Sequence, residues 1–515
     1  MEDRPGGRRD LGFITNHSYL DNPTFRGMRQ SLMASFDQLH ILNLHGNSLK
    51  KEKSPDGSKD ENVFDIQQGV AIILAVKRNG VPKGIWYSDL WGSRDAKYAA
   101  LGDGQMTQTT WQELKPRGDK YLFVPQDATL AVEYEQWPKV TEIFPVSSVG
   151  IVTARDELTI HFTPDQVWQT VNRFISMPPE EAREAFRLGK DARDWQVQLA
   201  QEDVRRSGPS QGRIVPILYR PFDVRYTYYT GHSRGFLCMP RNEIMRHMLS
   251  ENIGLCCIRQ AAIDDAFSHA LVCSDLVDNR AFLSSRGVVQ LCPLYLNGDD
   301  PAVHGHGVFT SSGQARKRVA NLNPAVMLRV ARSLRLHPIP DGRGDPAHSS
   351  MGPEDLFAYI YAILYSPTYR TRYAEFLKTD FPRIPFTKDR DTFLKLVELG
   401  QQLIDLHLMR SPELDNPISR FCGKGDTAVI KVEYDADRGR VSINPTQYFD
   451  GVTPDLWSYQ IGGYQVLAKW LKDRKGRFLT SADTIHYSRI VTALSLTGKL
   501  QVGIDDTISK SRTLA

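Results

Sequence analysis

Arginines and aromatic residues alternate in the stretch Ile217–His247, which reads ILYRPFDVRYTYYTGHSRGFLCMPRNEIMRH and holds five arginines against two acidic residues. A guanidinium offers two parallel donors to a guanine edge or a phosphate, and an aromatic ring can stack on a base. The pattern is therefore compatible with nucleic-acid contact. It is also compatible with a β-hairpin that has aromatic cross-strand pairs and solvated arginines.

A second basic run, KWLKDRKGR at Lys469–Arg477, has five cations and one acidic residue, with Trp470 among them. Cations near a helix C-terminus can bind phosphates, although such a run is also typical of a solvated helix end. Of the residues in the two stretches, we expect Arg225 and Arg234 to read base edges and Lys472 and Arg474 to contact phosphates. The full set of predicted contacts is Arg220, Arg225, Tyr228, Arg234, Arg241, Lys469, Lys472 and Arg474.

Other motifs give no catalytic centre. Phe421–Gly425 spells F-x-G-x-G, but it follows a proline-punctuated helix end, so we interpret it as a turn. Glu113-Leu114-Lys115 matches the E-x-K of metal-dependent nucleases, a tripeptide that a chain of this composition contains by chance. The sequence has no G-x-x-x-x-G-K-[ST] loop and no G-x-S-x-G elbow. Its histidines and six cysteines show no triad or metal-ligand spacing, so we predict neither catalytic residues nor a metal.

Composition indicates an ordinary globular protein. The 515 residues are 41% hydrophobic and 24% charged, with a formal net charge of +4, so any basic surface must be local. This length suggests about three domains. The N-terminus has no apolar leader, and the most apolar stretch, Leu356–Tyr365, is too short to span a bilayer. We expect a soluble protein without membrane contact.

The first hundred residues alternate strand and helix signals around a polar loop at residues 46–62. Phe25, Met28, Leu32 and Met33 have helical spacing and are expected to face the core, with Asn22 or Thr24 as N-cap. The continuous apolar run Gly69–Arg78 suits a buried strand. The remaining predicted strands are Leu11–Asn16, Gln38–His45 and Gly84–Gly92. Together these elements predict an α/β sheet.

The rest of the chain predicts short strands and separate helices. Pro178–Arg206 is expected to be one amphipathic helical region that begins with proline and acidic residues. A connector at residues 305–347 encloses one helix, and strands are expected within residues 428–443. The other predicted helices are Pro324–Leu336, Pro353–Tyr365, Arg390–Arg410, Gly463–Lys472 and Ser481–Leu500.

Several blocks together resemble a known family. GFITNHSYLDNPTFRGMRQSLMASFDQLHILNLHGN followed by VFDIQQGVAIILAVKR is similar to the part of γ-class adenine-N6 DNA methyltransferases that lies downstream of their Asn-Pro-Pro-Tyr loop. More narrowly, it resembles the Type ISP restriction–modification enzymes. YRPFDVRYTYY, DLFAYIYAILYSPTYRTRYAEFLKTDFPRIPF, YFDGVTPDLWSYQIGGYQVLAKWLKDRKGR and IHYSRIVTAL resemble later parts of the same enzymes.

The resemblance implies a fold and a domain order. We expect an α/β N-terminal part, the second half of a methyltransferase-like twisted sheet, followed by a mixed α+β target-recognition domain with a helical spacer. The boundaries would place the methyltransferase part at residues 1–95, the first recognition part at 96–305, the spacer at 306–415 and the second recognition part at 416–515. A half sheet would expose an apolar edge.

The resemblance suggests an interpretation for each of two segments near the N-terminus. Asn22-Pro23-Thr24-Phe25 spells most of the family's catalytic loop, yet it lies in a block that follows that loop in the family, so we interpret it as a helix start. The turn NVFDIQQGVAI (Asn62–Ile72) is similar to the family's turn before the strand that supports a flipped base. Phe64 is therefore the candidate ring for stacking near an extruded adenine, and the alternative is an ordinary core phenylalanine.

The resemblance also implies partners and a cofactor. The chain is expected to be the specificity part of a bacterial, cytoplasmic, site-specific adenine-N6 DNA methyltransferase that binds double-stranded DNA and uses S-adenosylmethionine. Neither the cofactor glycine loop nor an N-P-P-Y loop occurs at its family position, so we expect no methylation by this chain alone. A separately encoded methyltransferase, helicase and nuclease polypeptide would complete it. The alternative is a stand-alone DNA-binding specificity subunit or a decayed remnant with no enzymatic role.

Overall fold

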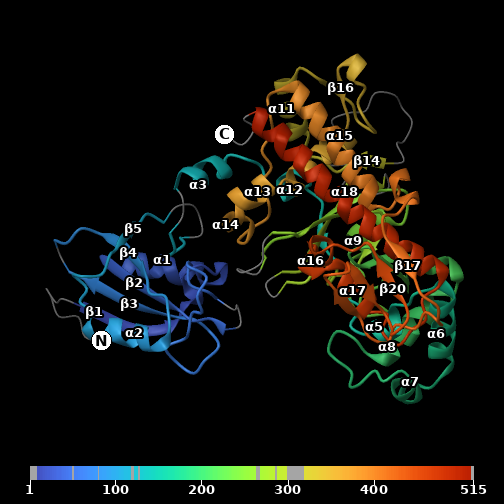
Figure 1. Cartoon of the computed structure of the whole chain (residues 1–515), viewed down its shortest axis with the longest axis horizontal. Helices are drawn as coiled ribbons and strands as arrows, with labels where there is room; N and C mark the ends of the chain where they lie inside the picture. The colour runs from blue at the N-terminus through green and yellow to red at the C-terminus, as the bar shows by residue number, and fades with distance from the viewer. Residues whose placement is uncertain are drawn as a thin grey trace. The chain divides into compact units, whose positions relative to one another are not determined.

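The chain forms two compact units, residues 1–133 and 134–515 (Figure 1). The computed structural model describes residues 9–48, 52–78, 80–116, 121–125, 128–261, 267–284, 287–297 and 318–511. Part of the predicted loop (residues 49–51) and part of the predicted connector (residues 305–317) lie outside the described residues. Helix α3 (Ala128–Glu135) crosses the boundary between the two units in the chain.

A five-stranded mixed sheet forms the centre of the first unit, in the order β1-β3-β2-β4-β5. The apolar run predicted as a buried strand is β3, which pairs antiparallel with β1 and β2, while β2 pairs parallel with β4. Ile41 and Ile73 are fully buried in the sheet core. The strands are β1 (Arg9–Asn16), β2 (Gln38–His45), β3 (Val70–Lys77), β4 (Gly84–Asp89) and β5 (Gln112–Leu114). The predicted strands of this unit are confirmed.

Helix α1 (Arg26–Ser35) lies where a helix was predicted, but its buried side differs from the prediction. Phe25 and Met28 are each 37% exposed, whereas Arg29 is fully buried. The Arg29 guanidinium donates to the backbone carbonyls of Tyr19 and Asn22, at 2.8 Å each. The helix packs an arginine inward because the chain before it turns sharply and leaves carbonyl oxygens that need donors.

The chain enters α1 through the 3-10 turn η2 (Pro23–Phe25), which follows η1 (His17–Tyr19). The Asn22 side chain accepts a hydrogen bond from the Thr24 amide at 3.0 Å, so it caps this turn. Phe25 is the N-cap of α1 and makes no side-chain cap bond, so the predicted N-cap was wrong. The helix start at Asn22–Phe25 is confirmed. Helix α2 (Arg94–Asp103) follows β4 in the same unit.

Small sheets and short helices build the first part of the second unit. One sheet has the order β10-β9-β12-β6, and a second has the order β11-β7-β8. Two further strand pairs are β13 with β14 and β15 with β16. The strands are β6 (Ser148–Val149), β7 (Ile214–Arg220), β8 (Asp223–Tyr228), β9 (Gly254–Ile258), β10 (Ala270–Cys273), β11 (Leu276–Val277), β12 (Val289–Pro293), β13 (Tyr295–Asn297), β14 (Arg318–Ala320), β15 (His337–Pro338) and β16 (Ser350–Met351).

The predicted helical region Pro178–Arg206 is two helices, α7 (Pro179–Ala185) and α8 (Val197–Ser207), so the single-region prediction was wrong. The residues between them turn through Gly189, at φ +65°, and bury Trp195, whose Nε1 donates to the Phe236 carbonyl at 3.2 Å. Asp191 accepts from the Val197 amide at 3.1 Å and so starts α8. A buried anchor and a capping carboxylate therefore interrupt the helical pattern.

The remaining helices of the second unit are α4 (Val140–Ile143), α5 (Asp156–Thr159), α6 (Pro164–Ser176), α9 (Asn242–Met245), α11 (Pro324–Leu334), α12 (Pro353–Tyr365), α13 (Pro367–Arg372), α14 (Ala374–Leu377), α15 (Arg390–His407), α16 (Pro454–Ser458), α17 (Val466–Lys472) and α18 (Ser481–Ser511). Among them, α11, α12, α15 and α17 agree with predicted helices within a few residues, α18 is longer than predicted, and the others were not predicted. A four-stranded sheet and a strand pair accompany the last helices: β17 (Arg420–Cys422), β20 (Tyr448–Asp450), β19 (Arg440–Ser442) and β18 (Glu433–Asp435), in that order, and β21 (Gln460–Ile461) with β22 (Tyr464–Gln465).

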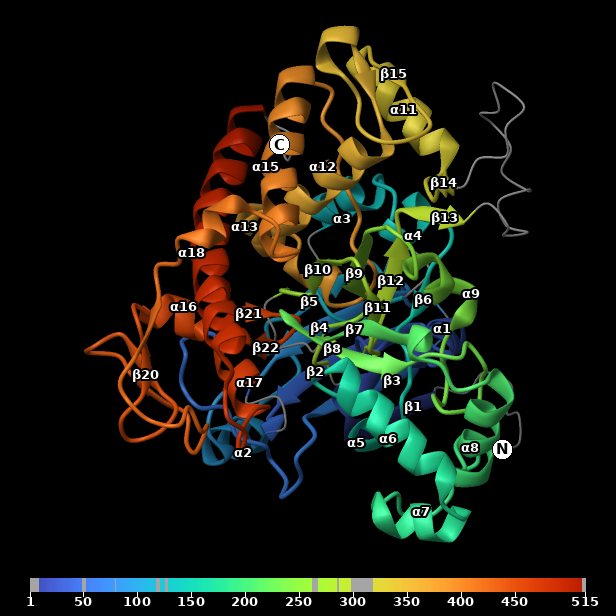
Figure 2. The ribbon, with the colours of Figure 1, turned by 90° about the vertical axis from the view of Figure 1, so that its right-hand side faces the viewer.

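Helices α12, α15 and α18 pack side by side (Figures 1 and 2). A buried polar chain joins them. The Tyr361 hydroxyl accepts from the Val272 amide at 3.1 Å and bonds Nδ1 of His407 at 2.6 Å, and Nε2 of His407 bonds Thr497 Oγ1 at 2.9 Å. Because Thr497 donates to the carbonyl of Ala493, His407 is the donor to Thr497 and carries its proton on Nε2. Burial lowers the pKa of His407 to about 3, so this ring stays neutral.

The two units are mixed α/β structures, as predicted in outline. That the five-stranded sheet is half of a methyltransferase sheet, and that domain boundaries fall at residues 95, 305 and 415, remain predictions. Among the helices that the structure describes, none combines the length and the apolar character needed to cross a membrane.

Candidate nucleic-acid interface

The two basic stretches of the sequence meet in the second unit. Strands β7 and β8 form a hairpin, and α17 with the loop after it lies against that hairpin (Figure 2). Asp223, at the start of β8, forms ion pairs with Arg225 of its own strand and with Arg474 of the loop. In each pair the arginine Nη2 lies 2.8 Å from the carboxylate. Arg225 Nη2 also lies 3.6 Å from Asp473. Residues about 250 positions apart therefore form one ionic group.

This ionic group is buried. Asp223 is 1% exposed, and Arg225 and Arg474 are 8% and 5% exposed. Burial acts to raise the pKa of Asp223, but the charges of Arg474 and then Arg225 outweigh it, so the pKa lies below its ordinary value. The carboxylate is therefore ionised at neutral pH, and the three side chains hold β8 to the loop after α17.

Aromatic rings lie between the arginines. The Phe162 ring, between α5 and α6, lies 3.8 Å from the guanidinium carbon of Arg477, 4.2 Å from that of Arg225 and 5.0 Å from that of Arg474. The Trp470 ring lies 3.4 Å from that of Arg474. We call Phe162, Tyr219, Arg220, Asp223, Arg225, Trp470, Arg474 and Arg477 the arginine–aromatic cluster. Stacking on a ring leaves the N–H edge of a guanidinium available for planar acceptors, and here Asp223 takes up the edges of Arg225 and Arg474.

Arg220 belongs to the buried part of this cluster. Its Nη1 lies 2.9 Å from Asp278, and its guanidinium carbon lies 3.7 Å from the Tyr219 ring. The Tyr219 hydroxyl donates to Asp156 at 2.9 Å. Burial raises the pKa of Asp278 to about 6, although the Arg220 charge acts to lower it. Asp278 therefore takes up a proton in mildly acidic solution, and Arg220 then loses its counter-charge.

The exposed cations of this region lie at the end of α17 and on the loop after it. Lys472 and Lys475 are exposed and Arg477 is half-buried. Within the part of the chain that the structure describes, Lys472 has no carboxylate within ion-pair distance, whereas Lys469 pairs with Asp473 at 2.5 Å. Phe478 beside them is 65% exposed. This edge of the cluster can meet a polyanion without first breaking an ion pair.

The other predicted contacts lie elsewhere in the second unit. Arg234 is exposed and lines a pocket of about 450 Å³ together with Arg206 and His232. Its guanidinium donates to the backbone carbonyl of Arg193 at 3.1 Å. Arg241, half-buried, precedes α9.

Tyr228 is fully buried and packs edge-to-face on Phe236, so its ring presents no surface to a ligand in this structure. The sequence singled out the arginines but missed Phe162 and the acidic anchors Asp223 and Asp473. Phe162 is a lone aromatic residue near the start of a helix, so the sequence gave no signal of its contact with the arginines. Asp223 and Asp473 were counted only as charges that oppose the arginines, so their role as anchors was not visible.

Phe64 lies in the first unit, on a turn and not in the core. Its ring is 42% exposed. Asn62 Oδ1 accepts from the Phe64 amide at 2.9 Å, and Arg94 donates to the Phe64 carbonyl at 3.1 Å. The turn is therefore fixed by its backbone, and the ring is accessible. The alternative of a core phenylalanine is wrong, while the stacking role stays a prediction.

The E-x-K and F-x-G-x-G motifs do not form a catalytic or cofactor site in the part of the chain that the structure describes. Glu113 and Lys115 lie at edge strand β5, exposed and 3.9 Å apart. Phe421 and Cys422 belong to strand β17, so the interpretation of Phe421–Gly425 as a turn was wrong for its first two residues. A Cβ at Gly423 would lie 2.0 Å from the Thr446 carbonyl oxygen, so this glycine allows two loops to pack closely.

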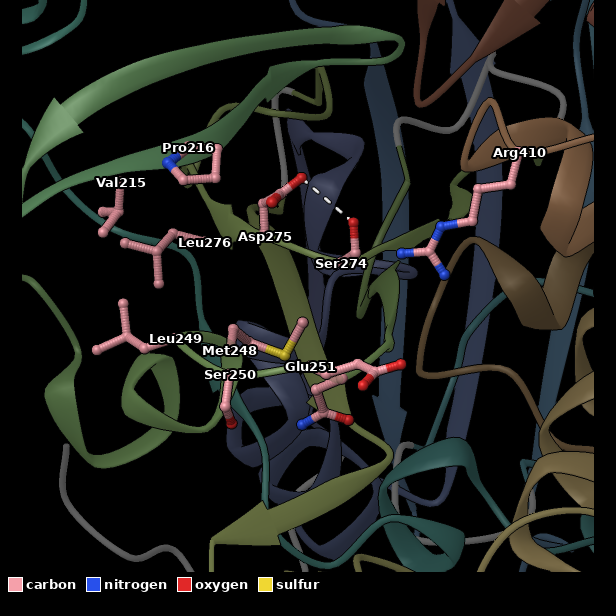
Figure 3. Close-up of a pocket in the computed structure, with 11 residues that line it drawn as sticks. Val215, Pro216, Met248, Leu249, Ser250, Glu251, Ser274, Asp275, Leu276 and Arg410 are labelled. Carbon is pink, nitrogen blue, oxygen red and sulfur yellow. Dashed lines mark hydrogen bonds between the residues drawn. The ribbon is translucent and has the colours of Figure 1, made fainter. Parts of the chain in front are cut away.

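A pocket of about 300 Å³ lies beside β7, β11 and the end of α15 (Figure 3). Ser274 donates to Asp275 at 3.3 Å, and burial raises the pKa of Asp275. Arg410 reaches in from the opposite side, and Leu249 forms part of an apolar wall. The lining residues are Val215, Pro216, Met248, Leu249, Ser250, Glu251, Asn252, Ser274, Asp275, Leu276 and Arg410. None of the predicted site residues lines this pocket.

Comparison with known proteins identifies the region that contains the cluster. Residues 142–500 match the family model of the Type ISP C-terminal specificity domain. A comparison with curated proteins gives no match.

Three solved structures are similar in fold. A DrdV–DNA complex determined by cryo-EM is 21% identical, with a TM-score of 0.64, over 98% of this chain and 50% of that chain. The ATP-dependent Type ISP restriction-modification enzyme LlaBIII bound to DNA is 20% identical, with a TM-score of 0.67, over 97% of this chain and 33% of that one. A nuclease-deletion mutant of the Type ISP enzyme LlaGI with a DNA substrate mimic is 21% identical, with a TM-score of 0.63, over 96% and 39%.

The chain thus spans between a third and a half of the length of these relatives. The family model covers more than half of the chain, including both basic stretches and the arginine–aromatic cluster that they form. The chain belongs to the Type ISP restriction–modification family and contains its C-terminal specificity domain.

Proposed function

We propose that this chain is the DNA sequence-recognition part of a site-specific adenine-N6 DNA methyltransferase of a restriction–modification system. The observation that carries the proposal is the arginine–aromatic cluster inside a Type ISP specificity domain. The relatives LlaBIII and DrdV were solved with DNA, which supports double-stranded DNA as the partner. Sequence would be read at base edges in the major groove, and phosphate contacts would set the register.

Within this surface, buried and exposed cations take different roles. Lys472 and Arg477 lie at the accessible edge and would contact DNA, Lys472 through phosphates. Arg225 and Arg474 were predicted as direct contacts, but both guanidiniums are buried and paired with Asp223. We propose that these two hold the surface in place. Arg234, exposed at its own pocket, remains the candidate for base contact.

Methyl transfer would need residues that this chain does not show at the family positions. S-adenosylmethionine would bind to a glycine loop and the adenine to an N-P-P-Y loop supplied by the rest of a longer enzyme or by a separate polypeptide. Phe64 is exposed on a fixed turn, as a ring that stacks on an extruded adenine must be. The chain's own contribution would be to choose the site and support the flipped base.

A DNA-binding titration over a range of salt concentrations tests recognition. Lys472→Ala should weaken binding to all sequences alike and reduce the slope of log affinity against log salt by about 1. Lys388→Ala is the matched control, because Lys388 is an exposed lysine two residues before α15, outside the cluster. Arg234→Ala should instead cost about 1–3 kcal/mol on the cognate site and relax specificity at one base pair. Equal effects of Lys472→Ala and Lys388→Ala would contradict the proposed surface.

A labelled-donor assay tests the catalytic part. The purified chain with duplex DNA and labelled S-adenosylmethionine should transfer no methyl group. Transfer by the chain alone would contradict the proposed incompleteness. Sequence-specific binding that no separately encoded methyltransferase polypeptide converts into methyl transfer would favour the alternative, a stand-alone specificity subunit or a remnant.

A further inference from the structure

Two histidines and a carboxylate converge at one end of the sheet in the first unit. His17 follows β1, His45 ends β2 and Glu52 lies on the loop after β2. Each of the three side chains can place one ligand atom within 4.8 Å of those of the other two. Both histidines are buried and Glu52 is half-buried. Sequence spacing gave no sign of this group, because the sheet brings positions 17 and 45 together.

A second layer of hydrogen bonds orients both rings. His45 Nε2 lies 2.7 Å from Asp89 Oδ1, and the Tyr87 hydroxyl donates to the same carboxylate at 2.5 Å. Asn43 donates to the Tyr87 hydroxyl at 3.0 Å, and its own Oδ1 lies 3.3 Å from Nδ1 of His17. Histidines that bind metals are oriented in this way, with the second ring nitrogen bonded to a carboxylate or an amide oxygen.

We propose that His17, His45 and Glu52 bind a divalent first-row transition cation, with zinc as the best fit. Two imidazole nitrogens and one carboxylate oxygen are a ligand set that zinc accepts, and a water would take the fourth position. Tetrahedral bonds of about 2.0–2.2 Å place ligand atoms roughly 3.4 Å apart. The three side chains would therefore close by no more than about 1.4 Å from the 4.8 Å limit.

The ion would tie the ends of β1 and β2 to the loop between β2 and β3. It would also stiffen the turn that carries Phe64. A Cβ at Gly69, the last residue of that turn, would lie 2.5 Å from the His17 ring, so the turn packs directly on this histidine. The same turn is held from the other side by Asn62, which donates to the Gly46 carbonyl at 3.0 Å. Metal binding would thus fix the position of the exposed Phe64 ring without touching it.

Zinc titration of the full chain tests the site. After treatment with a chelator, the protein should take up one equivalent of Zn²⁺ in competition with a chromogenic chelator, and Co²⁺ should give a visible absorption band. Glu52→Gln and His45→Asn should each lower zinc affinity at least 100-fold. Asp89→Asn should lower it about 10–100-fold, as expected for a residue that orients a ligand.

His40→Asn is the matched control, because His40 lies on the same strand, stacked on Trp86 and away from the group. It should leave zinc affinity unchanged. Thermal unfolding without zinc shows which variants keep the fold, and Glu52→Gln, on a loop and half-buried, should keep it. The proposal is overturned if the unmodified chain holds no zinc against the chelator, or if Glu52→Gln binds zinc as tightly as His40→Asn.

Discussion

Replacing Asp223 with asparagine tests whether the arginine–aromatic cluster is held together by charge. The substitution keeps the shape of the side chain but removes its negative charge. The guanidiniums of Arg225 and Arg474, both 2.8 Å from the carboxylate, then lose this counter-charge. Removing one partner of a buried pair costs about 3–5 kcal/mol. Asp473, 3.6 Å from Arg225, remains as its counter-charge, and within the described residues Arg474 keeps Asp483 as a carboxylate partner at 3.9 Å. We therefore expect a loss near the lower end, about 3 kcal/mol.

Urea unfolding of the full chain at pH 7 measures this loss. Asp435→Asn is the control, since Asp435 and Arg438 form an exposed pair at 3.5 Å in the same unit, and exposed pairs contribute about 0–1 kcal/mol. Adding Arg474→Met to Asp223→Asn should recover part of the stability, because the unpaired buried charge is removed. If Asp223→Asn and Asp435→Asn unfold within about 1 kcal/mol of each other, the reasoning that the buried ionic group anchors the hairpin is refuted.

Three further predictions concern stability. Because the pKa of His407 is lowered to about 3 from about 6.5, the unfolded state binds a proton in mildly acidic solution that the folded state does not. The contribution of His407 to the free energy of unfolding should be complete above pH 6.5 and fall by roughly 2 kcal/mol by pH 5. The variant His407→Gln should remove this part of the pH dependence of unfolding. Gly400→Ala should destabilise by about 1–3 kcal/mol in thermal unfolding, because its Cβ would lie 1.9 Å from the Ala358 carbonyl oxygen where α15 meets α12. Phe64→Ala should cost less than about 1 kcal/mol whereas Phe174→Ala, in the core, should cost about 3–5 kcal/mol; equal losses would contradict the exposed position of Phe64.

The sequence predicted the elements of the fold well where local physics decides. The apolar run of β3 and the proline-started α12 lie within a residue of the expected bounds, because continuous burial and a proline at the helix start leave few alternatives. Prediction was wrong where tertiary contacts override local pattern. Arg29 is buried by backbone carbonyls of a neighbouring turn, and Trp195 interrupts a helical pattern by entering the core.

The candidate interface was predictable only in part. Composition pointed to both basic stretches, since arginine and aromatic enrichment is visible along the chain. It did not indicate that the stretches meet, or that Asp223 is shared by an arginine from each of them, because the contact joins residues 251 positions apart. An arginine proposed to contact a base and an arginine proposed to support the surface are the same residue type in the sequence. Their burial in the structure is what distinguishes them.

The bond between Asp223 and Arg474 also constrains when the arginine–aromatic cluster can form during synthesis. A ribosome adds about 5–20 residues per second, so Arg474, 251 positions after Asp223, appears on the order of 10–50 s later. Until then the β7–β8 hairpin has no arginine from the later stretch, and Arg225 of the same strand is the arginine with which Asp223 can pair. The helices between them can pack earlier through local contacts. The cluster therefore cannot close before most of the second unit has been synthesised.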